Sequence, residues 1–169
     1  MAADTLNRDI RRPPIPAAPH RGGCLCGAVR YSYAAAPLST VACHCRDCQK
    51  LTGATNLLTI YADRAAFTHE QGELLRYRKR ADSGREADYA RCAQCGTRLW
   101  HEPLAAPQWI FIAAGTLDDP SWVVPVAHIW VSRAAPSALI PEGVCTWEKG
   151  PADRTELIAE FGKVYGKDL

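Results

Sequence analysis

Three cysteines in the segment 43–53, CHCRDCQKLTG, have a spacing that suits metal binding. Cys43, Cys45 and Cys48, called the cysteine triplet below, follow a C-x-C-x-x-C pattern. A structural zinc ion takes four protein ligands, whereas a catalytic zinc ion takes three and leaves its fourth position to water or substrate. A triplet without a fourth ligand is therefore typical of a zinc site that is open for chemistry.

Four further cysteines form two pairs. Cys24 and Cys26 make a C-x-C pair, and Cys92 and Cys95 make a C-x-x-C pair followed by glycine. Alternate residues of an extended chain project to the same side, and a tight turn directs both thiolates of the second pair to one point. Together the pairs predict a tetrahedral structural zinc site, called the four-cysteine cluster below. It would close a loop of 65 residues, 27–91, and so stabilise a small β domain.

Spacing alone leaves other partitions of these seven cysteines open. His44 could in principle complete the ligand set of the triplet. On an extended segment, however, its side chain should point away from those of Cys43 and Cys45. Cys145 lies apart from both groups, and we expect a buried apolar thiol there rather than a reactive one.

The composition is that of one folded domain. Of the 169 residues, 47% are hydrophobic and 22% are charged, and the net charge is +2. These values are ordinary for a globular protein and argue against a nucleic-acid binder with a strongly basic face. We expect the basic residues of 76–80 to form a solvated strand edge and turn. The acidic residues that accompany them are Glu73, Asp82, Glu86 and Asp88.

The sequence lacks the apolar segments of exported or membrane proteins. No stretch reaches the roughly 18 consecutive apolar residues that span a membrane. Charged residues and prolines interrupt the N-terminal segment where a secretion signal would need an apolar run. We therefore expect a cytoplasmic protein without a membrane partner. Eight cysteines in a reducing compartment indicate metal ligation or thiol chemistry rather than a disulfide framework.

The chain is expected to have a flexible, proline-rich leader over residues 1–21 and a single domain over residues 22–169. In the segment 28–33, AVRYSY, alternation places Val29, Tyr31 and Tyr33 on one face of a strand. Further strands are expected at 55–61, 73–79, 86–91, 97–102, 108–115 and 124–131. Because strands and helices do not alternate, we predict a mainly β fold with antiparallel sheets.

Two helices are expected to accompany the sheets. The shorter begins within the triplet, runs through RDCQKL and ends at Gly53, since glycine readily takes the left-handed conformation. The longer covers 153–166, with Asp153 as N-cap and Glu156 three residues later. Its apolar stripe comprises Leu157, Ile158, Phe161 and Val164 or Tyr165.

Five segments together resemble one known family. These are GGCLCGAVRY, CHCRDCQKLTGA, CAQCGTRLW, AAGTLDDP and HIWVSRAAP, in this order, between Gly22 and Pro136. In order and spacing they are similar to the glutathione-dependent formaldehyde-activating enzyme family, which also contains centromere protein V. Where that family usually has tryptophan after its AP pair, this chain has Ser137, and Trp147 could fill an aromatic position further on.

The resemblance implies a tent-like arrangement of antiparallel sheets and two zinc sites. By resemblance, the four-cysteine cluster holds a structural zinc ion, and the triplet holds a second, more labile zinc ion and is catalytic. The implied activity is that of a carbon–sulfur lyase, read in reverse as S-hydroxymethylglutathione synthesis from formaldehyde and glutathione. The implied partners are a small thiol such as glutathione and a small electrophile, and a homodimer is compatible with the sequence.

Two other functions are also compatible with the cysteine pattern. A zinc-stabilised binding module would use both zinc sites structurally, although its second site should then be closed by a fourth ligand. A thiol redox sensor would lose zinc from the triplet on oxidation and form a disulfide there.

Four residues near the triplet or in the strands have two competing interpretations. Gln49 could face a ligand or only help to end the short helix, and Arg46 and Lys50 could steer a carboxylate or merely be solvated. His128, on an apolar strand, is expected to be a core histidine, with a pocket acid or base role as the alternative.

Overall fold

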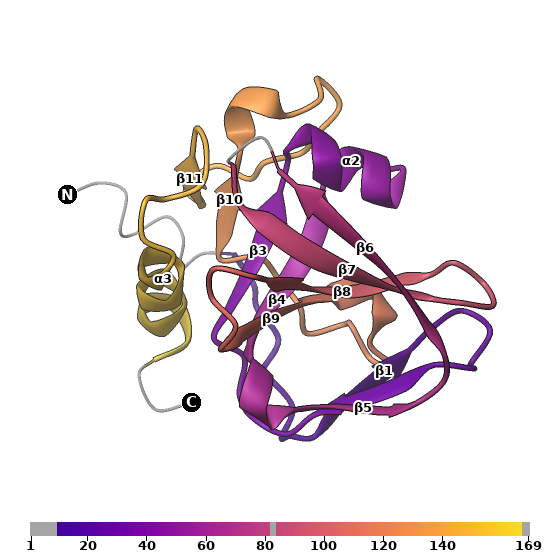
Figure 1. The fold of residues 1–169 in the computed structure, drawn as a ribbon. Coiled ribbons are helices and arrows are strands. Elements are labelled where there is room, and N and C mark those ends of the chain that lie inside the picture. The colour runs from indigo at the N-terminus through magenta and orange to yellow at the C-terminus, as the bar shows by residue number, and fades with distance from the viewer. Residues whose placement is uncertain (1–9, 82–83, 167–169) are drawn as a thin grey trace.

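The protein has two β-sheets and two α-helices in the part that the computed structural model describes, residues 10–81 and 84–166 (Figure 1). The small antiparallel sheet has the order β1 (His20–Gly23), β2 (Arg30–Tyr33) and β5 (Phe67–Gln71). The large sheet begins with β11 (Cys145–Trp147), β10 (Ala127–Ile129), β3 (Ser39–Cys43) and β4 (Leu57–Asp63). It continues with β9 (Trp109–Ala113), β8 (Arg98–Pro103), β7 (Glu86–Cys92) and β6 (Leu74–Arg80). The predicted mainly β fold is confirmed.

The large sheet is mixed rather than wholly antiparallel. Its strands from β3 to β6 pair antiparallel, but β10 pairs parallel with both β3 and β11. A parallel pair needs a long connection, and more than 80 residues separate β3 from β10. The periodicity of a strand does not encode the direction of its neighbour, so the sequence analysis missed this feature.

The two faces of the large sheet pack against different partners. Ile60 and Ala62 of β4 belong to a core cluster with Val29 and Tyr31 of the small sheet. Tyr61, between them, belongs to a second cluster that includes Leu157 and Phe161 of α3. This alternation is the period-2 pattern of a strand that is buried on both faces. Tyr31 and Tyr33 of β2 are buried, as predicted, and so is Val29 just before the strand.

Both predicted helices are present. Helix α2 (Arg46–Thr52) ends at Gly53, whose φ of 67° is left-handed, as expected. Helix α3 (Thr155–Tyr165) begins later than predicted, and its N-cap is Arg154 rather than Asp153. Asp153 Oδ1 accepts a hydrogen bond from the Thr155 amide at 2.9 Å, just before the helix. Leu157 and Phe161 are its buried residues, in agreement with the predicted stripe.

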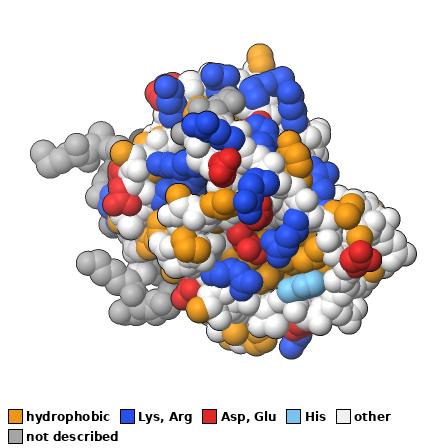
Figure 2. Space-filling view, in the orientation of Figure 1, with side chains coloured by type: hydrophobic (Ala, Val, Ile, Leu, Met, Phe, Trp, Pro, Cys, Tyr) orange, Lys and Arg blue, Asp and Glu red, His pale blue; other side chains and the backbone are white. Residues whose placement is uncertain are grey.

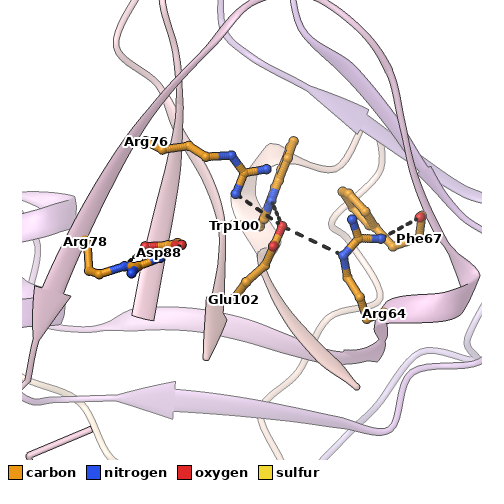
Figure 3. Close-up of polar contacts among 7 residues, drawn as sticks. All are labelled: Arg64, Phe67, Arg76, Arg78, Asp88, Trp100 and Glu102. Carbon is orange, nitrogen blue, oxygen red and sulfur yellow. Dashed lines mark hydrogen bonds and ion pairs between the residues drawn. The ribbon is translucent and has the colours of Figure 1, made fainter. Parts of the chain in front are cut away.

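The basic segment 76–80 lies in β6, the edge strand of the large sheet, where acidic side chains partner it (Figure 3). Arg78 Nε donates to Asp88 Oδ1 at 2.7 Å. Arg76 Nη1 lies 3.6 Å from Glu102 Oε1, which also accepts from Trp100 Nε1 at 2.9 Å. These contacts agree with the expected solvated strand edge.

The charge on the molecular surface is mixed. Figure 2 shows Lys and Arg side chains over the upper and central part of one face, with Asp and Glu side chains among them. Among the described residues, no helix is long and apolar enough to cross a membrane.

The expected leader lies partly outside the described residues. Residues 1–9 are not described, and His20 and Arg21 pair with Tyr33 and Ser32 of β2. Ile15 packs against both core clusters.

Candidate metal centres and the adjoining pocket

The four-cysteine cluster lies where the two sheets meet. Cys24 and Cys26 are in the β1–β2 loop of the small sheet, Cys92 ends β7, and Cys95 is in the β7–β8 turn of the large sheet. Their four Sγ atoms lie within 4.8 Å of one another. The Cys24–Cys26 and Cys26–Cys92 sulfur distances are 3.4 and 3.9 Å. A tetrahedral zinc ion about 2.3 Å from each sulfur would hold the sulfurs about 3.8 Å apart, so this donor set fits zinc.

Hydrogen-bond donors surround the cluster and favour its ionised form. The Val29 amide donates to Cys24 Sγ at 3.2 Å, and the Thr97 hydroxyl lies 3.1 Å from Cys95 Sγ. The hydrogen bond with Thr97 lowers the pKa of Cys95 to about 5. Donors of this kind orient thiolate ligands around a metal ion and share their negative charge.

The triplet is assembled by the junction of β3 and α2. Cys43 is the last residue of β3, Cys45 is the N-cap of α2 with φ −64° and ψ 155°, and Cys48 is in the first turn. The Cys48 amide donates to Cys45 Sγ at 3.4 Å. The three sulfurs lie within 4.8 Å of one another, and no fourth His, Cys, Asp or Glu within 10–81 and 84–166 joins them.

The triplet chemistry also fits a divalent cation. Hydrogen bonds from the other two thiols lower the pKa of Cys45 to about 3. The contact with Cys45 raises the pKa of Cys43 to about 12, and the contact with Cys43 raises the pKa of Cys48. The first proton therefore leaves easily, but a second thiolate would form beside an existing negative charge. A bound dication removes that penalty, because metal binding displaces the thiol protons.

A pocket of about 90 Å³, called the triplet pocket below, opens beside these sulfurs. Behind it, an aromatic row crosses four neighbouring strands of the large sheet: Tyr89, His101, Phe111 and Tyr61. Successive ring centroids are 5.1, 4.9 and 4.3 Å apart. Arg154 lies over this row, with its Cζ 4.9 Å from the Phe111 centroid. Tyr61, Tyr89 and His101 of this row line the triplet pocket.

His101 has a defined tautomer within this row. Arg98 Nη2 hydrogen-bonds to His101 Nδ1, and a guanidinium can only donate. His101 therefore carries its proton on Nε2. Burial, together with the charges of Arg98 and Arg154, holds the pKa of His101 well below its usual value. The lining of the triplet pocket thus includes a neutral histidine.

His44 and His128 form a buried pair on the other side of the triplet strand. His44 Nε2 and His128 Nδ1 are 2.9 Å apart, and the rings stack at 5.2 Å. The side chain of His44 thus reaches β10 instead of the three sulfurs, in the direction expected from the alternation of an extended chain. His128 is a buried histidine and is not in the lining of the triplet pocket within the described chain.

We expect the His128 ring to stay neutral well below the pH at which an exposed imidazole titrates. Burial, and then the neighbouring His44, lowers the pKa of His128 to about 4. Because this folded-state pKa is below the unfolded value near 6.5, the fold is stabilised above pH 6.5 and loses that stability as the pH falls towards 4. Imidazole ¹⁵N NMR between pH 7 and 5 should show neutral shifts, with the urea-unfolded protein as control. A folded-state midpoint near 6.5 would contradict this assignment.

Gln49 helps to position α2 through hydrogen bonds to other protein groups. Its Nε2 donates to the carbonyls of His44 at 2.6 Å and Arg133 at 2.8 Å, and its Oε1 accepts from Arg46. Asp47 on the same helix pairs with Lys79 of β6 at 2.9 Å. These contacts hold the helix that carries two triplet cysteines.

The remaining sequence candidates lie away from the sulfurs. Cys145 is partly buried in β11 against the second core cluster, and burial raises its pKa, which agrees with an unreactive thiol. Ser137 is exposed, and Trp147 packs against the same cluster. Lys50 is exposed on α2.

The sequence analysis missed four residues in or next to the triplet pocket: His101, Arg98, Trp130 and Arg154. His101 and Arg98 follow the C-x-x-C-G turn within six residues, which was the one available signal. Trp130 falls within the strand expected at 124–131, yet it has a left-handed backbone and borders the pocket. Arg154 is brought to the pocket only by the packing of α3.

Two comparisons with known proteins give a match. The model of the family described as glutathione-dependent formaldehyde-activating enzyme matches residues 19–133, more than half of the chain, and contains all seven clustered cysteines. A crystal structure of a Rhodobacter sphaeroides protein is also similar, with a TM-score of 0.47 and 20% identity. That match covers 58% of this chain and 87% of the other. On the family match, this chain belongs to the glutathione-dependent formaldehyde-activating enzyme family.

Proposed function

We propose that the protein is a zinc-dependent, carbon–sulfur lyase-like enzyme that acts on the adduct of a small thiol and a small aldehyde. Glutathione and formaldehyde are the pair that the family description names. One observation carries the proposal: three cysteine sulfurs lie together at a pocket, and no fourth protein ligand joins them in the described chain. A purely structural site would be closed by a fourth ligand.

Zinc at the triplet would bind the substrate sulfur as a thiolate at neutral pH. In the synthetic direction, this sulfur attacks the aldehyde carbon, a C–S bond forms, and the carbonyl oxygen becomes an alkoxide that takes a proton. In the lyase direction, the hydroxyl loses that proton, the C–S bond breaks, and thiolate and aldehyde leave. A tightly held thiolate is a weak nucleophile, so its sulfur must be loosely held during attack.

The chain supplies a hydrogen-bond donor for the oxygen in both directions. His101 lines the triplet pocket, and Arg98 maintains the neutral tautomer with its proton on Nε2, which is the donor that we assign to this oxygen. The phenols of Tyr61 and Tyr89 also line the pocket, and burial raises the pKa of each to about 12, so both remain protonated donors. Donors held in a fixed position stabilise a developing alkoxide.

The proposal is tested by the rate of exchange between glutathione and S-hydroxymethylglutathione. This reaction also proceeds without an enzyme, so exchange NMR at equilibrium must compare the zinc-loaded protein with buffer alone. We expect the protein to accelerate exchange and His101→Phe to reduce the acceleration by roughly 100-fold, as for the loss of one oxyanion donor. His69→Phe, on exposed β5, is the matched control and should keep the wild-type rate.

Two results would contradict the proposal in different ways. If the wild-type protein does not change the exchange rate for glutathione or for other thiol and aldehyde pairs, the proposed reaction is wrong. If His101→Phe is folded and exchanges at the His69→Phe rate, the reaction stands but His101 is not its donor. Thermal unfolding of both variants separates these outcomes from a folding defect, because Arg98 loses a hydrogen-bond partner in His101→Phe.

A further inference from the structure

A second hollow, called the cationic recess below, continues the triplet pocket toward α3. The two share Tyr61, Ile129, Trp130 and Arg154 in their walls. The recess has a volume of about 370 Å³, compared with about 90 Å³ beside the sulfurs. The triplet pocket can hold a sulfur and a one-carbon aldehyde, whereas the rest of a larger thiol needs the recess.

The walls of the recess are positively charged. Arg85, Lys149 and Arg154 line it, and no Asp or Glu of the described residues does. None of the ion pairs found between residues 10–81 and 84–166 involves these three side chains. The adjacent Asp153 uses Oδ1 to accept from the Thr155 amide at 2.9 Å. Three cations without a carboxylate partner in the described chain favour an anionic ligand.

Arg154 is held in place by contacts with aromatic rings, which do not neutralise its positive charge. Its Cζ lies 4.9 Å from the Phe111 ring centroid and 5.8 Å from that of Tyr61. Stacking on aromatic faces orients the planar guanidinium, whose N–H groups match a carboxylate in two parallel hydrogen bonds. Arg85 is oriented as well, because its Nη2 donates to the Ala152 carbonyl at 3.4 Å.

Trp130 lies in the walls of both hollows, and its backbone is strained. Its φ of 60° and ψ of 37° are left-handed, which costs a bulky residue on the order of 1 kcal/mol or more. This conformation is stabilised by a hydrogen bond from the Trp130 amide to the Lys149 carbonyl at 3.1 Å. The Nε1 atom of Trp130 also lies close to Gly150, and a Cβ added to that glycine would be 3.7 Å from it. The result is an indole in the walls of both hollows.

Charge at the triplet explains why a basic recess would be needed. Three thiolates and one zinc dication carry a net charge of −1, and a substrate thiolate makes it −2. A thiol that also carries carboxylates would be repelled unless cations lie close to them. Lys149 and Arg154 lie beyond the family-matched residues 19–133, so this part of the recess is supplied by the chain's own C-terminal segment.

We propose that the cationic recess binds a carboxylate of the thiol whose sulfur enters the triplet site, with Arg154 as the main contact and Arg85 and Lys149 beside it. This inference rests on the proposed function and adds selectivity to it: the preferred thiol is anionic. Arg154 determines specificity by binding a part of the substrate that does not react.

Binding of three related ligands to the zinc-loaded full-length protein tests this inference. Glutathione has both thiol and carboxylates, its diethyl ester keeps the thiol but has neutral esters, and S-methylglutathione keeps the carboxylates but cannot ligate as a thiolate. Calorimetry at low ionic strength measures the affinities. Arg154→Gln should lower the affinity for glutathione and for S-methylglutathione by about tenfold or more, and should hardly change the affinity for the diester. Lys149 is exposed, so Lys149→Gln should lower the affinity for the same two ligands to a smaller extent.

Arg133→Gln is the matched control, since it removes one exposed positive charge in the nearby 3₁₀ helix η3 (Val131–Arg133), outside the recess. It should bind all three ligands as the wild type does. If Arg154→Gln destabilises the fold through its lost aromatic contacts, Arg154→Lys keeps the charge and should restore part of the affinity. Wild-type binding that does not distinguish glutathione from its diester, including no binding of either, overturns the inference.

The outcomes also separate this inference from the proposed reaction. Arg154-dependent binding of S-methylglutathione without any catalysed exchange would keep the recess and refute the reaction. Catalysed exchange at equal rates with glutathione and its diester, unchanged in Arg154→Gln, would keep the reaction and refute the recess.

Discussion

Cys92→Ser is expected to leave the protein unfolded or insoluble. Cys92 ends β7 in the large sheet, and its sulfur lies 3.9 Å from that of Cys26 in the small sheet. Structural zinc sites contribute about 10–16 kcal/mol of apparent binding free energy, as much as the whole stability of a typical domain. Loss of one ligand would therefore remove the link between the sheets. Soluble yield, zinc content and circular dichroism measure the effect.

Cys145→Ser is the matched control for this experiment. Cys145 is a free cysteine in β11 outside both cysteine groups, and it is partly buried whereas Cys92 is buried. The substitution therefore removes a thiol without touching a candidate metal ligand. It should express and bind zinc as the wild type does, with a modest loss of stability. A soluble Cys92→Ser protein that lacks this zinc yet has the wild-type melting curve would show that the four-cysteine cluster is not a structural metal site.

Cys45→Ser is expected to abolish thiol exchange and the labile zinc ion while the fold persists. A zinc ion held by the triplet alone would expose one side to competing ligands, so wild-type protein should release zinc in two kinetic phases to a chromophoric chelator. The fast phase should disappear in the variant, and the slow phase, from the four-cysteine cluster, should remain. Serine suits this test because Cys45 is the N-cap of α2 and accepts from the Cys48 amide at 3.4 Å. A serine hydroxyl can accept the same hydrogen bond.

Cys45→Ala provides the comparison for the cap. It removes the metal ligand and also the acceptor, so it should be about 1 kcal/mol less stable than Cys45→Ser and equally inactive. If Cys45→Ser instead unfolds as completely as Cys92→Ser, the triplet is structural and the enzyme hypothesis loses its main support. If Cys45→Ser is stable, lacks the fast zinc phase and still exchanges thiols like the wild type, the zinc partition stands and the proposed reaction is refuted.

Local chemistry made much of this protein predictable from sequence. The cysteine pairs could be grouped because C-x-C and C-x-x-C-G bring two sulfurs together within a few residues, whatever the rest of the fold does. The buried face of β2 followed from the alternation of Val29, Tyr31 and Tyr33. The end of α2 followed from Gly53, because glycine tolerates the left-handed conformation at low cost. Each of these features depends on neighbours in the chain.

Strand pairing and packing between distant segments decided the rest. The pairing of β10 with β3 is parallel and brings His128 to His44, which is 84 residues away. The aromatic row exists only because the registers of four strands align, and Arg154 reaches it only because α3 packs on that face. The sequence by itself thus determined which residues can ligate metal and where both helices and most of the longer strands form, since these depend on local geometry. It did not predict β1, β3, β5 or β11. The tertiary structure alone decided what surrounds the triplet, because strand register and long-range packing are set by the whole chain.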